Sequence, residues 1–292
     1  MSLGPAGAVL PVDKPVGPTS HDMVAVVRRA LGIRKVGHTG TLDPFASGLL
    51  LVCLGRATRI AEYLTGLDKE YVATAELGVA TTTDDAEGDV VEEHRGWAAL
   101  DPSRIARELA TFVGTLEQVP PQYSAKKVRG EAMYRRARRG EQVELQPNRV
   151  NIRDAELLWV DLPRVRFRIR CSSGTYVRAV ARDLGNALGV GGHLTELRRT
   201  SVGGFGVGEA VHPDALADLD SVSSSLLDPL GALAHMPTWA VEDEIAGRLR
   251  HGQRVRYSGP PAAGPLTVAS GRELVAVGHV SEGVFKPSKV FS

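Results

Sequence analysis

Residues 37–48 combine chemically active side chains with glycines that free the backbone. The segment reads GHTGTLDPFASG, and Asp43 is its only carboxylate. Gly37 and Gly40 would let the backbone approach a ligand closely. An aspartate followed by a proline also begins many helices, as N-cap and first helical residue. The residues alone leave two interpretations of Asp43 open, a helix cap ahead of PFASGLLLV or a functional carboxylate, and a capping carboxylate can still face a cavity.

Other kinds of site find little support in the sequence. It contains no G-x-S-x-G nucleophile motif and no G-x-x-x-x-G-K-[ST] phosphate loop. The eight histidines are scattered, and the two cysteines, Cys53 and Cys171, lie in apolar or strand-like runs without zinc-site spacing. We therefore expect no metal and no redox cofactor.

The composition predicts a globular protein of the reducing cytoplasm. The hydrophobic fraction is 43% and the charged fraction 24%, and no run of 18 apolar residues could span a membrane. The N-terminal residues lack the basic and apolar regions of a signal peptide. At 292 residues, the chain is long enough for one large domain and a small one.

The charge distribution is more informative than the formal net charge of +1. Residues 126–139 carry seven cations against Glu131, and residues 164–182 carry six arginines and no acid. Clustered positive charge of this kind favours a polyanionic partner such as a nucleic acid. Taken singly, each segment could equally be a solvated face.

The patterning predicts elements that would position these groups. A helix is expected over residues 20–31 with Ser20 as N-cap and Gly32 at its end, and another over 101–113 with Asp101 as cap. Alternation predicts strands at 71–79 and at 164–171. A helix should follow at 175–189, with Arg178 and Arg182 one turn apart on the same side. Residues 119–150 fit no compact element, and the short strand patterns after residue 239 predict a small β-domain.

Several motifs resemble those of one family, the TruB-type tRNA pseudouridine synthases. They occur in the family's order over residues 9–205: VDKPVGPTSHDMV, GHTGTLDPFASGLLLVCLGRATR, DKEYVATAELGVATTTDDAEG, VPPQYSAKKVRGEAMY, SSGTYVRAVARDLG and HLTELRRTSVGGF. The C-terminal residues, ending in VAVGHVSEGVFKPSKVF, look like a PUA domain, an RNA-binding β-module.

The resemblance implies an α+β fold, with a mixed, largely antiparallel central sheet flanked by helices. It implies a catalytic domain over residues 1–238 with a basic thumb insertion at about 124–150, and a PUA-like domain over 239–292. The implied activity is isomerisation of the uridine at position 55 in the T loop of tRNA to pseudouridine, by base flipping and without a cofactor. The implied partner is the T stem-loop, and we expect a monomer with no obligatory protein partner.

The resemblance also assigns site residues. Asp43 matches the catalytic aspartate, Arg178 its partner arginine, and Tyr71 an active-site tyrosine that stacks on the base and is placed to help remove a proton. Without the resemblance, Tyr71 would be read as a buried strand aromatic. Whether the aspartate attacks the sugar, the uracil ring or neither stays open.

Other positions are matched to substrate binding. His38 should stack into the T loop where the base has left, Tyr176 and Leu194 should line the pocket, and Lys14 should support the fold around it. By residue type alone, His38 would be a loop or core histidine and Lys14 a surface charge. In the thumb, Lys126, Lys127 and Arg129 are expected on RNA phosphates.

Two other readings of the whole chain compete with this one. A non-catalytic RNA-binding or chaperone protein would have no need of Asp43, Tyr71 and Arg178 together. A guide-RNA-dependent relative of the dyskerin type is disfavoured by the basic thumb and by the absence of long charged tails.

Overall fold

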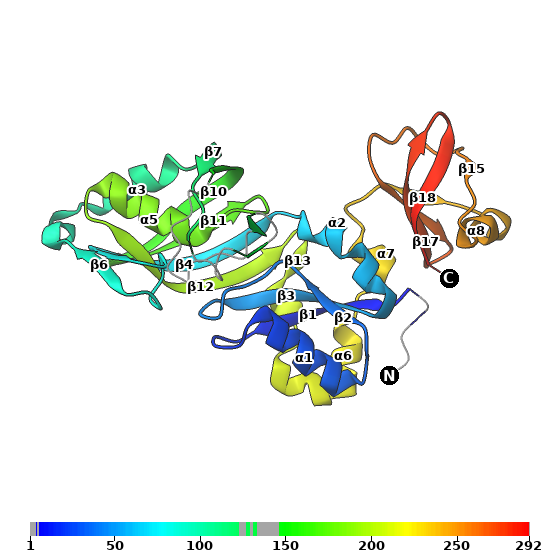
Figure 1. Ribbon diagram of the computed structural model, residues 1–292, viewed down its shortest axis with the longest axis horizontal. Helices are drawn as coiled ribbons and strands as arrows, with labels where there is room; N and C mark the ends of the chain where they lie inside the picture. The colour runs from blue at the N-terminus through cyan, green and yellow to red at the C-terminus, as the bar shows by residue number, and fades with distance from the viewer. Residues whose placement is uncertain (1–3, 5, 123–126, 129–130, 133–145, 292) are drawn as a thin grey trace.

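The computed structural model describes residue 4 and residues 6–122, 127–128, 131–132 and 146–291. Within these residues, nine strands form one sheet, with the order β1-β3-β12-β4-β11-β10-β7, and with β2 added to β3 and β13 to β12 (Figure 1). Only the β12–β3 pair is parallel. The predicted α+β class with a mixed, largely antiparallel central sheet is confirmed.

The strands of this sheet are β1 (Ala8–Lys14), β2 (Val36–Thr39), β3 (Ser47–Leu54), β4 (Lys69–Leu77), β7 (Gly114–Gln118), β10 (Asn148–Asp161), β11 (Arg164–Cys171), β12 (Gly192–Val202) and β13 (Phe205–Gly206). Two separate pairs are formed by β5 (Val79–Thr81) with β6 (Val90–Glu93), and by β8 (Lys127–Val128) with β9 (Glu131–Ala132). The α-helices of the described residues are α1 (Ser20–Leu31), α2 (Ala61–Thr65), α3 (Pro102–Ala110), α5 (Val177–Leu188), α6 (Leu219–Ser225), α7 (Pro229–Ala232) and α8 (Asp243–Arg250). The 3₁₀ turns are η1 (Gly55–Ile60), η2 (Arg95–Ala99), η3 (Val207–Glu209) and η4 (Pro213–Ala217).

Helices α3 and α5 cover one face of the β4–β11 half of the sheet. The alternation of β11 buries Val165, Phe167 and Ile169 against α5 and leaves the arginines between them on the other face. Arg168 pairs there with Glu156 of β10. The strand predicted at 164–171 and its apolar face are confirmed, and this arginine stripe is a largely solvated sheet face.

Both faces of the β1–β3 half of the sheet are buried. Alternate residues of β1 and β3 pack against α1, η4 and α6 on one face, and against η1, α2 and α7 on the other. A central strand of this kind is apolar throughout, as the sequence SGLLLVCL is. The helix that an Asp43 cap would begin is therefore absent from these described residues: β3 takes its place, and Asp43 lies in the turn that precedes it.

The N-cap of helix α1 lies one residue earlier than predicted, and the difference affects the site. Thr19 is its N-cap and forms a capping box with Asp22, and Gly32 ends the helix with a φ of 66°. Ser20, the predicted cap, is instead a buried residue whose hydroxyl bonds to the backbone of Leu42, next to Asp43.

A second sheet lies at the C-terminal end of the chain, beside the β1–β3 half (Figure 1). It has the order β14-β16-β17-β18-β15, from strands β14 (Thr238–Ala240), β15 (Val255–Arg256), β16 (Leu266–Ser270), β17 (Glu273–Ser281) and β18 (Val284–Val290), and α8 packs on it. Residues 210–236, which precede this sheet in the chain, pair and pack along β1. The division at residue 238 into a catalytic and a PUA-like domain stays a prediction.

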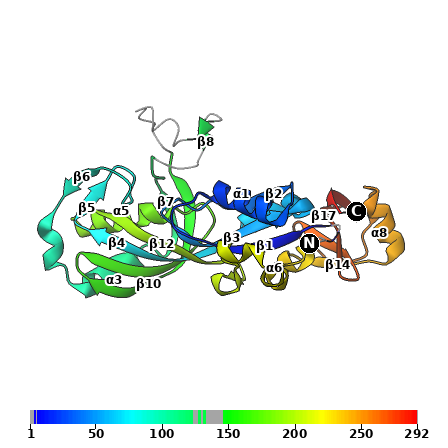
Figure 2. The same cartoon turned by 90° about the horizontal axis from the view of Figure 1, so that it is seen from below.

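Most of the predicted thumb lies outside the described residues. Strand β10 begins at Asn148 and pairs with β7, so residues 148–150, assigned to the insertion, belong to the sheet. In Figure 2 the short strand β8 stands away from the sheet, on the side where α1 and β2 lie. Among the described residues, no helix combines the length and the apolar composition needed to cross a bilayer.

Gly48 is the position at which β3 meets β12 most closely. Its φ is 105°, and a Cβ atom there would lie 2.2 Å from the carbonyl oxygen of Arg199. We expect Gly48→Ala to lower the free energy of unfolding by about 2–4 kcal/mol, from backbone strain and overpacking. Urea denaturation measures this change.

The matched control is Gly247→Ala in α8, where no neighbouring atom lies within 4 Å of the new Cβ. Alanine should stabilise this helix by about 0.5–1 kcal/mol. Equal stabilities for the two variants would contradict the close approach of β3 and β12.

Candidate active site

A cavity of about 230 Å³ opens between the loop that joins β2 to β3 and the N-terminal end of α5. The lining includes Asp43, Tyr71 and Arg178, which the sequence had placed in one site, and adds Lys69 and Arg199. Three cations and one carboxylate thus face the cavity. It is smaller than the roughly 300–1,000 Å³ of pockets for drug-sized ligands, a size that suits one small ring system.

Lys14 holds the loop that carries Asp43. Its side chain is fully buried, and Nζ donates hydrogen bonds to the carbonyls of Pro15 (2.9 Å), Pro18 (2.8 Å) and Pro44 (3.3 Å). Burial lowers the pKa of Lys14 to about 8, and the nearby charge of Asp43 opposes this shift. Lys14 therefore acts as a clamp beside Asp43, and it is not the surface charge that its residue type would suggest.

The other end of the same loop is held by Ser20 and Arg199. The Ser20 hydroxyl accepts a hydrogen bond from the N–H of Leu42 at 2.8 Å and donates one to its carbonyl at 3.2 Å. The guanidinium of Arg199, 1% exposed, donates to the carbonyls of Leu49 (2.7 Å) and Gly40 (3.1 Å). The loop is fixed by side chains where it lacks the hydrogen bonds of a regular element.

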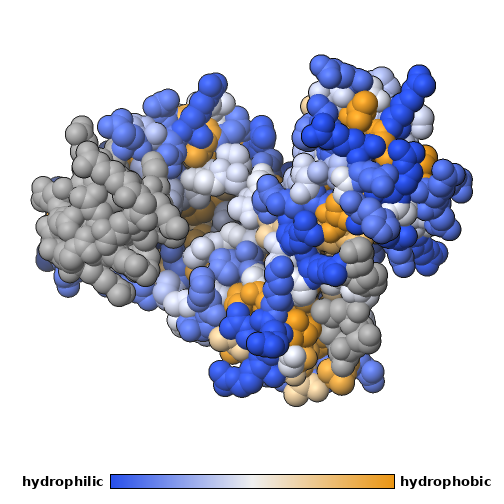
Figure 3. Space-filling model, turned by 45° about the vertical axis from the view of Figure 1, so that its right-hand side comes forward, coloured by the Kyte–Doolittle hydropathy of each residue, from blue (hydrophilic) through white to orange (hydrophobic). Residues whose placement is uncertain are grey.

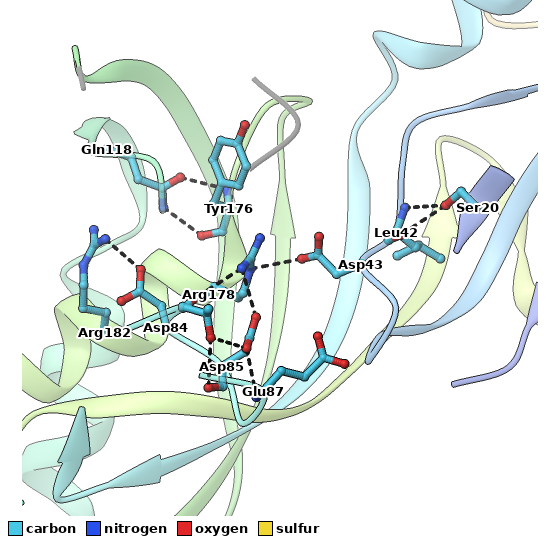
Figure 4. A network of polar contacts seen from close by, with 11 residues as sticks. Ser20, Leu42, Asp43, Asp84, Asp85, Glu87, Gln118, Tyr176, Arg178 and Arg182 are labelled. Carbon is cyan, nitrogen blue, oxygen red and sulfur yellow. Dashed lines mark hydrogen bonds and ion pairs between the residues drawn. The ribbon is translucent and has the colours of Figure 1, made fainter. Parts of the chain in front are cut away.

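Arg178 links Asp43 to a second carboxylate, Asp85 (Figure 4). Its Nε lies 3.0 Å from Oδ2 of Asp43, and its Nη1 lies 2.9 Å from Oδ2 of Asp85 and 3.0 Å from the Thr83 carbonyl. The Arg178 and Asp85 side chains are only 5% and 4% exposed, whereas that of Asp43 is 36% exposed. Asp43 is thus the member of the network that an entering substrate can reach.

The turn after β5 presents two neighbouring aspartates in opposite directions. Asp84 has a φ of 59° and binds Arg182 at 3.0 Å, one turn along α5 from Arg178. Asp85 accepts hydrogen bonds from the Thr83 hydroxyl and, at 3.1 Å, from the N–H of Glu87. The pair Asp84 and Asp85 thus orients both arginines of α5 (Figure 4).

Burial and Arg178 act in opposite directions on the Asp43 carboxyl. Burial raises its pKa above the ordinary range, the guanidinium of Arg178 lowers it, and the charge of Asp85 raises it again. A carboxylate whose ionised form burial disfavours therefore has a fixed cation 3.0 Å away that favours that form.

Tyr71 of β4 and Arg199 of β12 lie side by side on neighbouring strands of the sheet. They are register partners, both line the cavity, and Tyr71 is 8% exposed. Burial raises the pKa of Tyr71, and the charge of Arg199 opposes that shift. The hydroxyl thus stands beside a cation at the cavity wall.

Tyr176, at the N-cap of α5, also lines the cavity. Gln118 of β7 holds its backbone, with Nε2 donating to the Tyr176 carbonyl at 3.1 Å and Oε1 accepting from the Tyr176 N–H at 2.8 Å (Figure 4). The β7 strand thereby fixes one wall of the cavity.

Two residues predicted near the substrate lie elsewhere. Leu194 is fully buried in the core, and Leu197 lines the cavity in its place. A β-bulge between Leu194 and Glu196 shifts the register of β12, so the positions that face inward do not follow simple alternation. His38 lies on β2 outside the cavity lining, 5.6 Å from the ring of His21, and its buried Nδ1 has no hydrogen-bond partner among the described residues.

The predicted phosphate contacts are not described by the structure. Lys126 and Arg129 lie outside the described residues, and only the strand position of Lys127 is known.

Three members of the site were missed by the sequence analysis. Asp85 lies in DDAEGD, an acidic run typical of a solvated turn, and Lys69 and Arg199 lie in strands. Each was part of a motif quoted for the resemblance, and that was the only sequence signal for these residues.

The comparisons with known proteins agree on one class. Residues 28–177 match the N-terminal domain model of the TruB family pseudouridylate synthases, and residues 178–236 match the tRNA pseudouridylate synthase B C-terminal domain. The tRNA pseudouridine synthase B of Burkholderia pseudomallei (strain 668) is 44% identical over 292 residues, covering 97% of this chain and 96% of the relative. That of Thermobifida fusca (strain YX) is 45% identical over 297 residues, covering 98% and 99%.

Solved structures show the same fold. An H/ACA RNP bound to a substrate RNA containing 2'-deoxyuridine matches with a TM-score of 0.76 and 26% identity, and the archaeal box H/ACA Nop10–Cbf5 complex with 0.76 and 27%. Each match covers 98% of this chain and 86% of the other. Fold and family are those of a pseudouridine synthase, which is an isomerase. The chain belongs to the TruB family of pseudouridylate synthases.

The different partners of Asp84 and Asp85 allow a matched test. Asp85→Asn removes a charge from the buried pair with Arg178, so we expect pseudouridine formation to fall at least about tenfold through kcat. Asp84→Asn, one residue away, changes the ion pair with the more exposed Arg182, which keeps Asp183 as a partner, and should leave kcat within about twofold. Single-turnover assays on unmodified tRNA measure both. Equal losses for the two variants would contradict a role of Asp85 through Arg178.

Proposed function

We propose that this protein isomerises the uridine at position 55 in the T loop of tRNA to pseudouridine, with Asp43 as the catalytic residue. The main support is the position of the Asp43 carboxylate, which lines the cavity. Buried Arg178, itself bound to Asp85, holds this carboxylate in place. The relatives named above are tRNA pseudouridine synthases, which supports tRNA as the substrate.

The reaction breaks the bond between C1' of the ribose and N1 of uracil, turns the base, and joins C1' to C5. The proton on C5 is lost and N1 gains one, so no electrons and no other atoms are exchanged. Such a rearrangement needs a correctly placed anion and a proton acceptor, and the absence of a cofactor stays our prediction. The Asp43 carboxylate supplies the anion, whether it acts on the sugar or on the ring.

The hydroxyl of Tyr71 is our candidate for helping remove the proton from C5. Tyr71 lies at the cavity wall beside Arg199, its register partner on β12. The adjacent cation also favours the phenolate that proton transfer requires, against the effect of burial on the pKa of Tyr71. Arg199 is thus a positioning residue for both Tyr71 and the loop before Asp43.

Base flipping is the step that admits the uridine. Extruding a base costs a few kcal/mol, and stacking on an aromatic ring returns about 1–3 kcal/mol. We propose that Tyr71 stacks on the flipped uracil, with Tyr176 in the cavity wall, and that His38, outside the cavity, fills the place the base has left. Leu194 contributes indirectly, because its N–H donates to the Asp84 carbonyl at 3.0 Å.

Direct recognition of tRNA fits this chain better than guidance by a separate RNA. The relatives at 44–45% identity are tRNA pseudouridine synthases by name, whereas the H/ACA structures are only 26–27% identical. A protein that only binds RNA would not need an Asp43 carboxylate held in a cavity by a buried arginine. We propose a cytoplasmic monomer without an obligatory protein partner.

Asp43→Asn keeps the size of the side chain and removes its charge. We expect turnover to fall by at least about 10³-fold while tRNA binding stays within a few-fold of wild type, because the lost group acts on the reacting atoms. Release of tritium from 5-tritiated uridine in unmodified tRNA measures turnover, and filter binding measures affinity. Tritium release by Asp43→Asn at the wild-type rate would contradict the catalytic role.

The thumb lysines are proposed to contact phosphate. Replacing Lys126, Lys127 and Arg129 by Gln should reduce the slope of log K against log salt for tRNA binding by about 2–3, one for each lost phosphate contact. The control is Arg95→Gln with Arg107→Gln, two exposed cations on η2 and α3. An unchanged slope in the thumb variant would mean that the thumb does not touch the backbone.

A further inference from the structure

Lys69 is a buried cation in the wall of the catalytic cavity, two residues before Tyr71. It is the first residue of β4, and the alternation of the strand directs Lys69 and Tyr71 to the same face of the sheet, where they are 5% and 8% exposed. Both side chains line the cavity, together with Arg199 of β12. The wall that carries the tyrosine therefore also carries two cations.

The Lys69 ammonium is held by the backbone at the end of α2. Its Nζ donates hydrogen bonds to the carbonyls of Thr65 and Leu67, each at 2.6 Å. An ammonium has three N–H groups, so one donor remains after these two bonds. Within the described part of the chain, Lys69 forms no ion pair with a carboxylate, and the adjacent Asp68 binds Arg153 at 3.0 Å. The ammonium is thus fixed in place by neutral carbonyl groups.

Arg199 lies beside Lys69 in the same wall. A Cβ atom added to Gly40 would lie 3.9 Å from Cε of Lys69 and 3.8 Å from Nη1 of Arg199, so both cations reach the loop before Asp43. The Arg199 guanidinium, like the Lys69 ammonium, donates to backbone carbonyls. The third cation of the lining, Arg178, is the one bound to carboxylates. Among the described residues, the wall formed by β4 and β12 therefore has an excess of positive charge.

This positive charge suits the charge that uracil develops during the reaction. When the bond between C1' and N1 breaks, its electron pair leaves with the base and is shared between N1 and the two carbonyl oxygens, while the Asp43 carboxylate balances the electron-poor C1'. If Asp43 instead adds first to the ring, the negative charge moves to a carbonyl oxygen of that ring. The charge disappears when C5 joins C1', after which C5 loses its proton and N1 gains one. A donor already in position stabilises this transient charge more than it stabilises neutral uridine.

We propose that Lys69 is a further catalytic residue, whose remaining N–H donates to a carbonyl oxygen of the uracil ring while that ring carries negative charge. This role rests on the proposed function, because it requires a flipped uridine in the cavity. A cavity of about 230 Å³ holds one small ring system, so a base that faces Asp43 also lies close to the wall that carries Lys69. Charge on the ring is then stabilised whether Asp43 acts on the sugar or on the base.

This role requires the charged form of Lys69. Burial lowers the pKa of Lys69 to about 8 and the charge of Arg199 lowers it further, whereas Cys171 and Asp68 oppose the shift. Burial raises the pKa of Cys171 itself to about 11, so that thiol stays protonated near neutral pH. A neutral Lys69 amine would use both of its N–H groups on the two carbonyls and turn a lone pair to the remaining direction, as a base would. The donor and the base therefore differ in the sign of their pH dependence.

The test uses two variants of Lys69. Lys69→Met removes the charge and the hydrogen bonds, and Lys69→Gln removes the charge but keeps N–H donors for the two carbonyls, which guards against a variant that only fails to fold. Single-turnover pseudouridine formation on unmodified tRNA is measured from about pH 6 to about pH 9.5, and the ratio of the wild-type rate to the variant rate is followed. This ratio cancels the titration of Lys14, whose pKa is also about 8, because every protein compared retains it.

We expect the ratio to be at least about tenfold near pH 7 and to fall towards one above about pH 9, because wild type loses the Lys69 charge as pH rises through the pKa. Binding of tRNA should stay within a few-fold of wild type. A ratio that grows with pH would make Lys69 a base, and a ratio that does not change with pH would make its role structural. Either result would overturn the proposal.

A second substrate separates charge stabilisation from a general loss of structure. Fluorine on C5 withdraws electrons and stabilises the uracil anion by itself, so the reaction should depend less on a nearby cation. With 5-fluorouridine in the tRNA, disappearance of that nucleoside is followed after nuclease digestion. We expect both Lys69 variants to slow it by no more than about threefold, against at least about tenfold for uridine. Equal losses on the two substrates would also overturn the role.

The matched control is Lys289→Met in β18. Lys289 binds Glu62 of the same helix α2 at 3.0 Å and does not line the cavity. Figure 3 shows mostly hydrophilic side chains on the visible face of the C-terminal unit, at the upper right, so the loss of one charge there changes little. The control should match wild type on both substrates at every pH. Wild-type protein that forms no pseudouridine in any tRNA would mean failure of the proposed function, which is distinct from an active wild type whose Lys69 variants are equally active.

Discussion

The buried guanidinium of Arg178 is the interaction on which the active-site geometry depends. A cation that is 5% exposed has lost most of its hydration, at a cost of several kcal/mol that only closely placed anions and carbonyls offset. Its partners come from distant parts of the chain, Asp43 before β3 and Asp85 with Thr83 after β5. Displacing any of these segments leaves a buried charge poorly compensated, so each segment fixes the others. The carboxylate that faces the cavity is thereby placed before a substrate arrives, which is the condition for electrostatic catalysis.

The loop that carries Asp43 is held in a similar way, by hydrogen bonds from buried side chains to its backbone carbonyls. Carbonyls that no strand or helix satisfies are taken by the Lys14 ammonium, the Ser20 hydroxyl and the Arg199 guanidinium. Two of these donors are charged and almost fully buried, so their hydrogen bonds are as necessary to them as to the loop. Arg199 also contacts Tyr71, so the placement of the loop and that of the tyrosine hydroxyl are coupled.

Local patterning predicted the elements that depend on local rules. The alternation of β11 and the apolar face of α5 agree with the structure, because each element buries one face on the same core. The pattern at Asp43 was ambiguous, since Asp-Pro before an apolar run suits a capped helix. The run is a strand because it is buried on both sides, which only the neighbouring elements determine.

The site itself was predictable only in part. Asp43, Tyr71 and Arg178 do line one cavity, but this expectation came from resemblance and not from spacing. Asp85 could not be distinguished from a solvated acid, because its partner Arg178 is 93 residues away. Leu194 was also assigned by resemblance; it is fully buried, and Leu197 lines the cavity beyond a bulge in β12 that leaves little trace in one sequence.

The contact between the two sheets extends these constraints beyond the active site. Val277 and Phe291 of the C-terminal unit share a buried cluster with Leu51 and Ile60, so this unit is docked as well as tethered. The buried contacts therefore fix the position of the C-terminal unit relative to β3, the strand that follows the Asp43 loop. A change in this contact would reach the active-site loop through β3, because the same strand pairs with β12, which carries Arg199.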